Sequence, residues 1–386
     1  MTKNKEIVLV LLITFLYHTM NQMFVPTLPL YISDRGGGEV VVGGIVGLLS
    51  VGAIVAKAYL GKTATRRSNL FVLRIGLVTA TLVLFLYQPF FGFAFLALVR
   101  LLQSLGLGGF VVGAQGMLSD HTERQNRGFF FGIFAAMIGL GMMAGPLLGS
   151  FLAENLGYPM LFGGATLVVG LAAALSFMIK EKANMSGPGM GRKYQPHSPW
   201  KNRELLVLSG SMLVSAAVVG ATSSMLTLHA RAVGIASPSL FFSLLALAYT
   251  LSGAACGHLS DRFGRHALII PGFGLLILGL LLLAGLNGMT LLILAAVLVG
   301  VGFGCVNTVL MAMVPGVSVN EVDTANDLAF FSNAFDLGIV VGSMGLSWLA
   351  AKSYGLFWLA VAVLNVFGLL LYVRCNPKQR SARAQV

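Results

Sequence analysis

Charged side chains are scarce in this 386-residue chain: Asp, Glu, Lys and Arg together make up 10% of it. A soluble globular domain normally carries about 25% charged residues, whereas 57% of this chain is hydrophobic. The available polar residues cannot cover so much apolar surface, which excludes an ordinary soluble domain. The solvent that suits such a chain is a lipid bilayer.

Cysteine is also rare. The three cysteines, Cys256, Cys305 and Cys375, lack metal-ligand spacing and fall in apolar stretches or in the C-terminal tail. We expect small buried hydrophobic side chains rather than a disulfide or a metal site. The sequence also lacks a nucleotide-binding lysine motif and a catalytic triad. It therefore predicts no metal, no cofactor and no enzyme activity.

Long apolar stretches recur along the whole chain. Each can cross about 30 Å of hydrocarbon at about 1.5 Å per residue. The twelve stretches that we predict to be transmembrane helices are 6–30, 40–60, 70–88, 91–118, 129–153, 158–179, 204–228, 238–258, 267–286, 289–314, 325–350 and 354–373. The first is longer than a signal-peptide core and lacks a small-residue cleavage site, so we expect it to be retained.

The net charge of +12 is distributed asymmetrically. With twelve spans both termini share one side of the membrane, and 21 of the 25 Lys and Arg residues fall on that side. Only Arg35, Arg231 and Lys352 fall on the other side. Positive charge marks the cytoplasmic side, so we predict a multi-pass protein of the plasma or inner membrane with both termini in the cytoplasm. The basic residues orient the chain and do not indicate nucleic-acid binding.

A polar segment divides the spans into six and six. Residues 181–203 are rich in Gly, Pro and charge, which is typical of a linker. We predict a six-helix bundle over 1–180, a cytoplasmic linker over 181–203, a second six-helix bundle over 204–374 and a basic cytoplasmic tail over 375–386.

The two halves echo each other in sequence. The segment GKTATRRS at 61–68 matches GHLSDRFGR at 257–265. Two pairs of glycines repeat at an offset of 197 residues, Gly141 with Gly338 and Gly145 with Gly342. A repeat of this kind predicts an all-α membrane protein of two pseudo-symmetric six-helix bundles, with a site between them that is exposed to each side in turn.

Three segments carry a resemblance to a known family. The loop motif after the eighth span contains Gly257, Asp261, Arg262, Gly264 and Arg265. The segment RLLQSLG at 100–106 supplies Arg100 and Gln103, although Ser104 replaces a usual glycine. The segment at 141–152 supplies Gly141, Gly145, Pro146 and Gly149. Together these motifs resemble the major facilitator superfamily, and the last is similar to the fifth-helix motif of its twelve-span drug:proton antiporter branch.

The resemblance implies a gate at the cytoplasmic end. Its second-half residues would be those of the loop motif, and its first-half residues Gly61, Arg66, Asp120 and Arg127. The first half departs from the family pattern, because Thr65 stands where an aspartate is usual and Ser68 where a glycine is usual. We therefore expect the first-half lock to be weak and the lock made by Asp261 near Arg127 to be intact. For the fifth-helix glycines we expect close packing, a tight hinge between the bundles, or both.

Two ionisable residues fall near the middle of predicted spans. Arg100 lies about nine residues into the fourth span, and Asp336 lies about 18 Å along the eleventh. An ionisable group at such a depth costs about 2.5 kcal/mol or more, so it is kept away from lipid and usually has a function. The resemblance suggests proton or substrate handling for Arg100. A structural arginine bonded to backbone carbonyls is the alternative.

Asp336 belongs to a polar stripe. With a helical spacing, Asn326, Asn333, Asp336, Ser343 and Ser347 share one face of the eleventh span. Such a face predicts a polar cavity or a partner helix. A low dielectric disfavours the charged carboxylate, so the group can take up a proton, and its deprotonated form can receive a cationic substrate. An ion pair with Arg100, or hydrogen bonds to neighbouring Asn and Ser, are the alternatives.

The first span carries a second polar face. His18, Asn21 and Gln22 have i, i+3, i+4 spacing, and His18 titrates in the physiological range. A histidine with a structural hydrogen bond is the alternative. Gln103, Asn307 and Asn333 complete the candidate residues for proton coupling and substrate binding.

These features predict a secondary active transporter. We expect a monomeric, proton-coupled exporter (an antiporter) of small amphipathic organic molecules or drugs, whose partners are its substrate, protons and the bilayer. An exporter of a narrow physiological substrate, such as a metallophore, sugar or lipid, is an alternative. A non-transporting membrane sensor is another, which the glycines, the acid and the gate motif disfavour because a sensor needs none of them.

Overall fold

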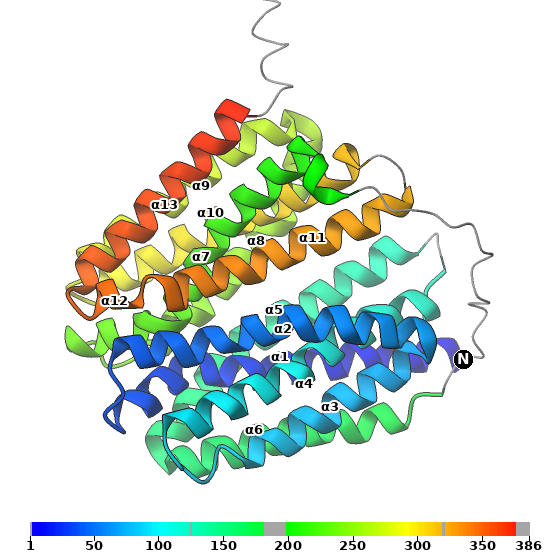
Figure 1. The fold of residues 1–386 in the computed structure, drawn as a ribbon, viewed down its shortest axis with the longest axis horizontal. Coiled ribbons are helices and arrows are strands. Elements are labelled where there is room, and N and C mark those ends of the chain that lie inside the picture. Colours follow the sequence, from blue (N-terminus) through cyan, green and yellow to red (C-terminus); the bar gives the residue numbers. More distant parts are fainter. Residues whose placement is uncertain (1, 124–125, 181–197, 319–320, 376–386) are drawn as a thin grey trace, which may run out of the picture. The chain divides into compact units, whose positions relative to one another are not determined.

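The structure is a computed structural model that describes residues 2–123, 126–180, 198–318 and 321–375 (Figure 1). Over these ranges the chain is helical and contains no strand. It divides into two compact units, Met1–Met190 and Gly191–Val386. Most of the predicted linker (181–203) and of the predicted tail (375–386) falls outside the described residues, so these boundaries stay predictions.

The first unit, drawn from blue to green in Figure 1, consists of six long helices. They are α1 (Thr2–Ser33), α2 (Glu39–Arg66), α3 (Asn69–Phe85), α4 (Phe93–His121), α5 (Arg127–Leu156) and α6 (Tyr158–Phe177). Ser68 caps the start of α3, because its hydroxyl accepts a hydrogen bond from the Phe71 amide at 3.1 Å. The residue that departs from the family pattern therefore begins a helix.

The second unit, drawn from green to red, repeats this plan. A short 3-10 helix, η1 (Pro199–Lys201), precedes its long helices. The helices are α7 (Arg203–Ala232), α8 (Ser239–Phe263), α9 (Arg265–Ala284), α10 (Met289–Val317), α11 (Glu321–Val340) and α13 (Tyr354–Cys375), with the π-helical η2 (Val341–Gly345) and the short α12 (Ser347–Ala350) between the last two.

Length and composition support membrane crossing. Within the described ranges eleven helical segments are long and apolar enough to span a bilayer, and α11, η2 and α12 together supply one of them, Asn326–Ala350. The twelfth apolar helix, α3, is shorter, with 17 residues. The predicted all-α membrane fold is therefore confirmed.

The same pattern of helix contacts appears in both units. In the first, α1 packs against α5 and α6, α4 packs against α2 and α3, and α3 also packs against α6. In the second, α7 packs against α11 and α13, α10 packs against α8 and α9, and α9 also packs against α13. Each contact has its counterpart six spans later, so the sequence repeat is a repeat of structure.

Glycines hold α1 and α5 at backbone contact. A Cβ atom added at Gly141 would lie 2.8 Å from the Cβ atom of His18, and one added at Gly145 would lie 2.6 Å from that of Gln22. Only glycine permits this approach, which in lipid replaces the hydrophobic drive that packs helices in water. The helix α5 continues through Pro146 from Arg127 to Leu156. The fifth-helix motif therefore packs α5 against α1 inside one unit, and its predicted hinge role stays a prediction.

The equivalent seam joins α11 to α7. A Cβ atom added at Gly338 would meet the carbonyl oxygen of Leu213, and one added at Gly342 would meet that of Ala217. These two glycines match Gly141 and Gly145 in the sequence repeat. The matched pairs therefore have the same packing role in the two units.

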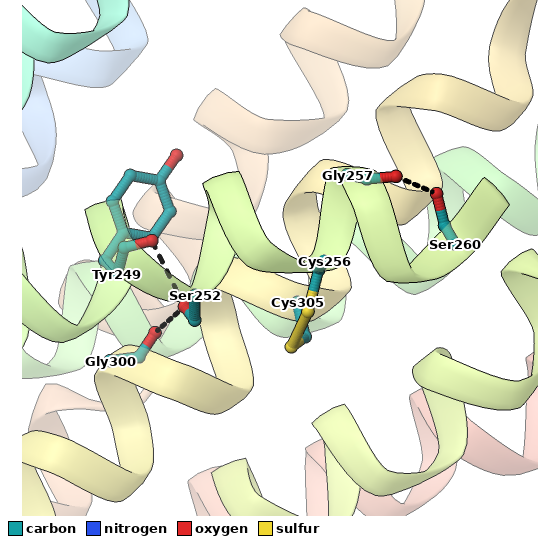
Figure 2. Close-up of a disulfide and its surroundings, with 7 residues drawn as sticks. All are labelled: Tyr249, Ser252, Cys256, Gly257, Ser260, Gly300 and Cys305. Atoms are coloured by element: carbon teal, nitrogen blue, oxygen red, sulfur yellow. Dashed lines mark hydrogen bonds between the residues drawn. A yellow bond between two sulfur atoms is a disulfide. The ribbon is translucent and has the colours of Figure 1, made fainter. Parts of the chain in front are cut away.

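The prediction that the cysteines pack as separate hydrophobic side chains is wrong for two of them. Cys256 of α8 and Cys305 of α10 form a disulfide, with their Cα atoms 5.6 Å apart (Figure 2). Their helices pack closely because Gly304 has no side chain. A Cβ atom added there would lie 2.7 Å from the carbonyl oxygen of Tyr249. The two residues are 49 positions apart, and their spacing in the sequence does not reveal this juxtaposition.

The loop motif after α8 is more helical than its sequence suggests. The helix α8 continues through the motif to Phe263, and α9 begins at Arg265. Gly264 alone separates them, with a φ of 85° that favours glycine. Gly257 lies inside α8, and a Cβ atom added there would have nothing within 4 Å, so it makes no close contact with another helix.

The seam between α1 and α5 yields a stability prediction. We expect Gly145→Val to destabilise the protein by about 1–3 kcal/mol, because the added side chain overpacks a backbone contact. Gly132→Val is the matched control on the same helix, since Gly132 is exposed and has nothing within 4 Å of an added Cβ atom. Thermal unfolding of the detergent-purified variants measures the difference. Equal melting temperatures for the two variants would contradict the seam.

Candidate functional site

Arg100 belongs to a buried polar network in the first unit. It is 6% exposed on α4, and its Nη1 donates to Gln103 Oε1 at 2.9 Å. The Tyr87 hydroxyl, from the turn after α3, donates to the same oxygen at 2.6 Å. Gln103 therefore joins the arginine to the tyrosine.

This network has unused hydrogen-bonding capacity. The Nε atom of Arg100 and the Nε2 atom of Gln103 are buried without a hydrogen-bond partner. Among the described residues of the first unit, no carboxylate pairs with Arg100. The alternative of an arginine bonded to backbone carbonyls is not what the structure shows, because Arg100 donates to the side chain of Gln103. Asp336 lies in the other unit, so its pairing with Arg100 stays a prediction.

The polar face of α1 is open. His18, Asn21 and Gln22 are half-buried, and their side chains make no hydrogen bond to any residue that the structure describes. The ring of His18 meets that of Phe110 edge to face at 5.5 Å, and Phe110 stacks on Tyr17 at 3.9 Å. His18 and Gln22 also flank the glycine seam with α5. The glycine seam therefore positions the polar face of α1, and the donors and acceptors of that face stay available.

Asp336 is buried in the second unit. It is 7% exposed on α11, two residues before Gly338 of the seam with α7. Its neighbour Phe335 faces Phe303 of α10, with ring centroids 6.3 Å apart. Asn333, one turn earlier, is half-buried. The carboxylate thus lies inside the protein, and its predicted depth near the middle of the membrane stays a prediction.

Part of the predicted polar stripe has a different role. The hydroxyl of Ser343 donates to the carbonyl oxygen of Ile339 at 2.7 Å, and that of Ser347 donates to the carbonyl oxygen of Met344 at 3.0 Å. Both serines are at most 1% exposed. Each hydroxyl donates to a backbone carbonyl about one turn earlier, in or next to η2. The two serines are therefore not pocket residues. The π-helical turn there had no signal in the sequence.

Asn307 forms a pair that the sequence did not indicate. Its Nδ2 atom donates to the hydroxyl oxygen of Tyr249 on α8 at 2.6 Å. The ring of Tyr249 stacks on that of Phe303 at 5.5 Å. A tyrosine in an apolar span resembles any core aromatic in the sequence, so Tyr249 and Tyr87 could not be singled out. Only their polar partners, Asn307 and Gln103, indicated in the sequence that a polar pair could form in these spans.

The first-half gate residues make local contacts. Asp120 at the end of α4 accepts a hydrogen bond from Asn69 at the start of α3, at 2.7 Å. Arg127 donates to the carbonyl oxygen of Ser119 at 3.4 Å, where a cation complements the end of a helix. Gly61 has open space around it, and Arg66 is exposed. Asn69 therefore supplies a link between α3 and α4 that sequence reasoning missed, on the side where a weak lock is expected.

The second-half gate residues remain less defined. Arg262 and Arg265 are exposed at the junction of α8 and α9. Ser260 donates to the carbonyl oxygen of Gly257 at 2.8 Å (Figure 2). The side chain of Asp261 lies outside the described residues, so its predicted lock near Arg127 stays a prediction.

A family model decides the identity. The model described as Major Facilitator Superfamily matches residues 10–236 and 208–386, which together span nearly the whole chain. The chain belongs to the major facilitator superfamily. It is therefore a multi-pass membrane transporter of small molecules rather than an enzyme.

Relatives in this superfamily include drug exporters. The chain is 28% identical to the multi-drug resistance efflux pump PmrA of Streptococcus pneumoniae over 366 residues, which cover 88% of this chain and 87% of PmrA. It is 25% identical to the quinolone resistance protein NorA of Staphylococcus aureus over 194 residues, half of each chain.

Solved structures share the fold. The nucleoside transporter NupG matches with a TM-score of 0.79 at 16% identity, over 96% of this chain and 98% of NupG. A bacterial homologue of the human lysosomal transporter Spinster, in an inward-facing and occupied conformation, matches with a TM-score of 0.81 at 14% identity, over 96% of each chain. At such low identity these structures establish the superfamily fold alone.

The network around Arg100 yields a second prediction. We expect Gln103→Leu to destabilise this transporter by about 1–3 kcal/mol, because it leaves the Arg100 guanidinium and the Tyr87 hydroxyl without their shared acceptor. Gln88→Leu is the matched control, because Gln88 is exposed and donates only to the carbonyl oxygen of Pro159 at 3.3 Å. Melting temperatures in detergent provide the measurement. A decrease in melting temperature no larger than that of Gln88→Leu would show that the network contributes nothing to stability.

Proposed function

We propose that this protein is a proton-coupled exporter of small amphipathic organic molecules, with both termini in the cytoplasm. The observation that carries the proposal is the buried carboxylate of Asp336 in a membrane-spanning helix of a transporter fold. An acid at such a position is costly and is typical of proton relays in transporters. Similarity to the efflux pump PmrA over 88% of this chain supports export as the direction.

A carboxylate can couple two fluxes because its charge changes with protonation. Protonated Asp336 is neutral and stable in an apolar surround, whereas the deprotonated form attracts a cation or a hydrogen-bond donor. Binding of the proton and of the substrate then exclude each other at one group. Exchange of the two across the membrane follows if the substrate displaces the proton on the cytoplasmic side and the proton displaces the substrate on the outer side.

The first unit has polar and aromatic groups of its own that suit an organic substrate. The open face of His18, Asn21 and Gln22 offers donors and acceptors beside the apolar rings of Tyr17 and Phe110. Arg100 adds a positive charge whose Nε atom has no hydrogen-bond partner. A modest-sized organic molecule with both apolar and polar parts fits this inventory better than an inorganic ion does. We propose these residues, with Gln103, Asn333 and Asn307, as the substrate and coupling set.

The coupling role of Asp336 is tested in proteoliposomes. We expect the wild-type protein to accumulate ethidium against its gradient when a pH gradient is imposed. Asp336→Asn should abolish this accumulation yet retain downhill exchange, because an amide cannot carry the proton. Glu154→Gln is the matched control, since it also removes one negative charge but at an exposed position of α5.

Two results would go against the proposal. Accumulation that is undiminished in Asp336→Asn would assign proton coupling to another group, such as His18. The absence of transport across a panel of cationic, neutral and zwitterionic aromatic drugs would favour a non-transporting sensor.

A further inference from the structure

The second unit contains a polar pair that joins Asn307, a member of the proposed substrate and coupling set, to Tyr249. Tyr249 of α8 and Asn307 of α10 are both half-buried, and Asn307 Nδ2 donates to the Tyr249 hydroxyl at 2.6 Å. Within the described part of the chain neither side chain makes a second hydrogen bond. A tyrosine hydroxyl has one donor and can also accept, and an amide has an acceptor oxygen beside its donors. The pair therefore keeps the Tyr249 O–H as a donor and Asn307 Oδ1 as an acceptor next to each other, with the second N–H of the amide as a further donor.

The presence of both a remaining donor and a remaining acceptor does not depend on how the amide of Asn307 is oriented. If the Tyr249 hydroxyl donated to the amide oxygen instead, the tyrosine oxygen would remain an acceptor and the amide nitrogen a donor. In both arrangements the pair presents at least one donor and one acceptor to a ligand.

Aromatic rings form a partly buried apolar cluster beside the pair. The ring of Tyr249 lies 5.5 Å from that of Phe303 with an interplanar angle of 25°, and Phe303 lies 6.3 Å from Phe335 at 34°. The three rings come from α8, α10 and α11. Phe335 directly precedes Asp336, so this aromatic cluster extends from the polar pair to the helix that carries the acid. Planar aromatic ligands gain from offset stacking on such rings.

The backbone holds the pair in place. Gly304 has no side chain, so α8 and α10 can stay in close contact. A Cβ atom added there would lie 2.7 Å from the Tyr249 carbonyl oxygen. The hydroxyl of Ser252 donates to that same carbonyl oxygen at 3.1 Å and lies 3.5 Å from the carbonyl oxygen of Gly300 (Figure 2). The disulfide between Cys256 and Cys305 joins the same two helices. A rigid support of this kind is what a selective hydrogen-bonding site requires.

We infer that Tyr249 and Asn307 form a subsite for planar aromatic molecules that carry a lactam or carboxamide. A lactam presents a carbonyl acceptor beside an N–H donor, which complements the donor and acceptor that the pair keeps, and its ring packs against the half-buried ring of Tyr249. The inference rests on the proposed export function, because it names a class of substrate for that transporter. A site built to hydrogen-bond such a group discriminates against an analogue that lacks it.

Two matched fluorescent compounds test the subsite. They are 7-amino-4-methyl-2-quinolone and its N1-methyl derivative, which differ only in the lactam N–H. We expect the full-length protein in detergent to bind the lactam about tenfold more tightly in equilibrium dialysis, since one hydrogen bond contributes about that factor. Equal affinities, or no binding of either compound, would overturn the inference.

Variants connect the preference to the pair. Asn307→Leu should weaken lactam binding about tenfold and change binding of the N1-methyl compound by less than about twofold, so that the preference disappears. Tyr249→Phe keeps the stacked ring and should also weaken lactam binding. Tyr59→Phe, at an exposed position of α2, should bind both compounds as the wild type does. A preference that persists in both Asn307→Leu and Tyr249→Phe would contradict the inference.

The outcomes separate this inference from the proposed function. Dialysis measures binding without a pH gradient, so the lactam preference can hold in a protein that fails to couple transport to protons, and the reverse can also occur. If Asn307→Leu does not fold, as its melting curve would show, Tyr249→Phe and the wild-type comparison still decide the question.

Discussion

Backbone contact at glycine seams is the constraint on which the rest of this structure depends. Apolar helices in lipid gain little by leaving it, so they associate through close packing and hydrogen bonds. Gly141 and Gly145 bring α5 onto α1, and Gly338 and Gly342 bring α11 onto α7. Each seam fixes the rotation of its helices and thereby decides which side chains avoid lipid. His18 and Gln22 flank one seam, and Asp336 lies two residues before the other.

The two units use their buried polar groups differently. In the first, Arg100, Gln103 and Tyr87 form a joined network, whereas the polar face of α1 has no partner among the described residues. In the second, the carboxylate of Asp336 shares a region with the aromatic rings of Phe335 and Phe303. A duplicated scaffold therefore carries unlike buried polar groups in its halves, an arginine network in one and a carboxylate in the other.

Much of the fold could be predicted because lipid imposes simple rules on sequence. Span length, the glycine repeat and its constant offset identified two six-helix bundles, and the packing of Gly141 and Gly338 shows why the repeat persists. The individual site contacts were less accessible. Ser343 and Ser347 share a face with Asp336, yet they bond to their own backbone. Periodicity gives the face of a helix, whereas the competition between backbone and pocket for a hydroxyl depends on local geometry.

Pairs that are distant in sequence were beyond prediction for the same reason. Cys256 meets Cys305, Tyr249 meets Asn307 and Asn69 meets Asp120, each through the register of two packed helices. A single sequence specifies that register only through small-residue contacts such as those of Gly304.

The central claim, exchange of protons for substrate, has a direct measurement. Proteoliposomes that contain the wild-type protein and the pH dye pyranine are loaded with ethidium and diluted into ethidium-free buffer at equal pH, with the membrane potential clamped by potassium and valinomycin. If the account is right, outward flow of ethidium drives protons inward and the lumen acidifies, and protein-free liposomes show no such change. Ethidium efflux through the protein with no change in lumenal pH would contradict it.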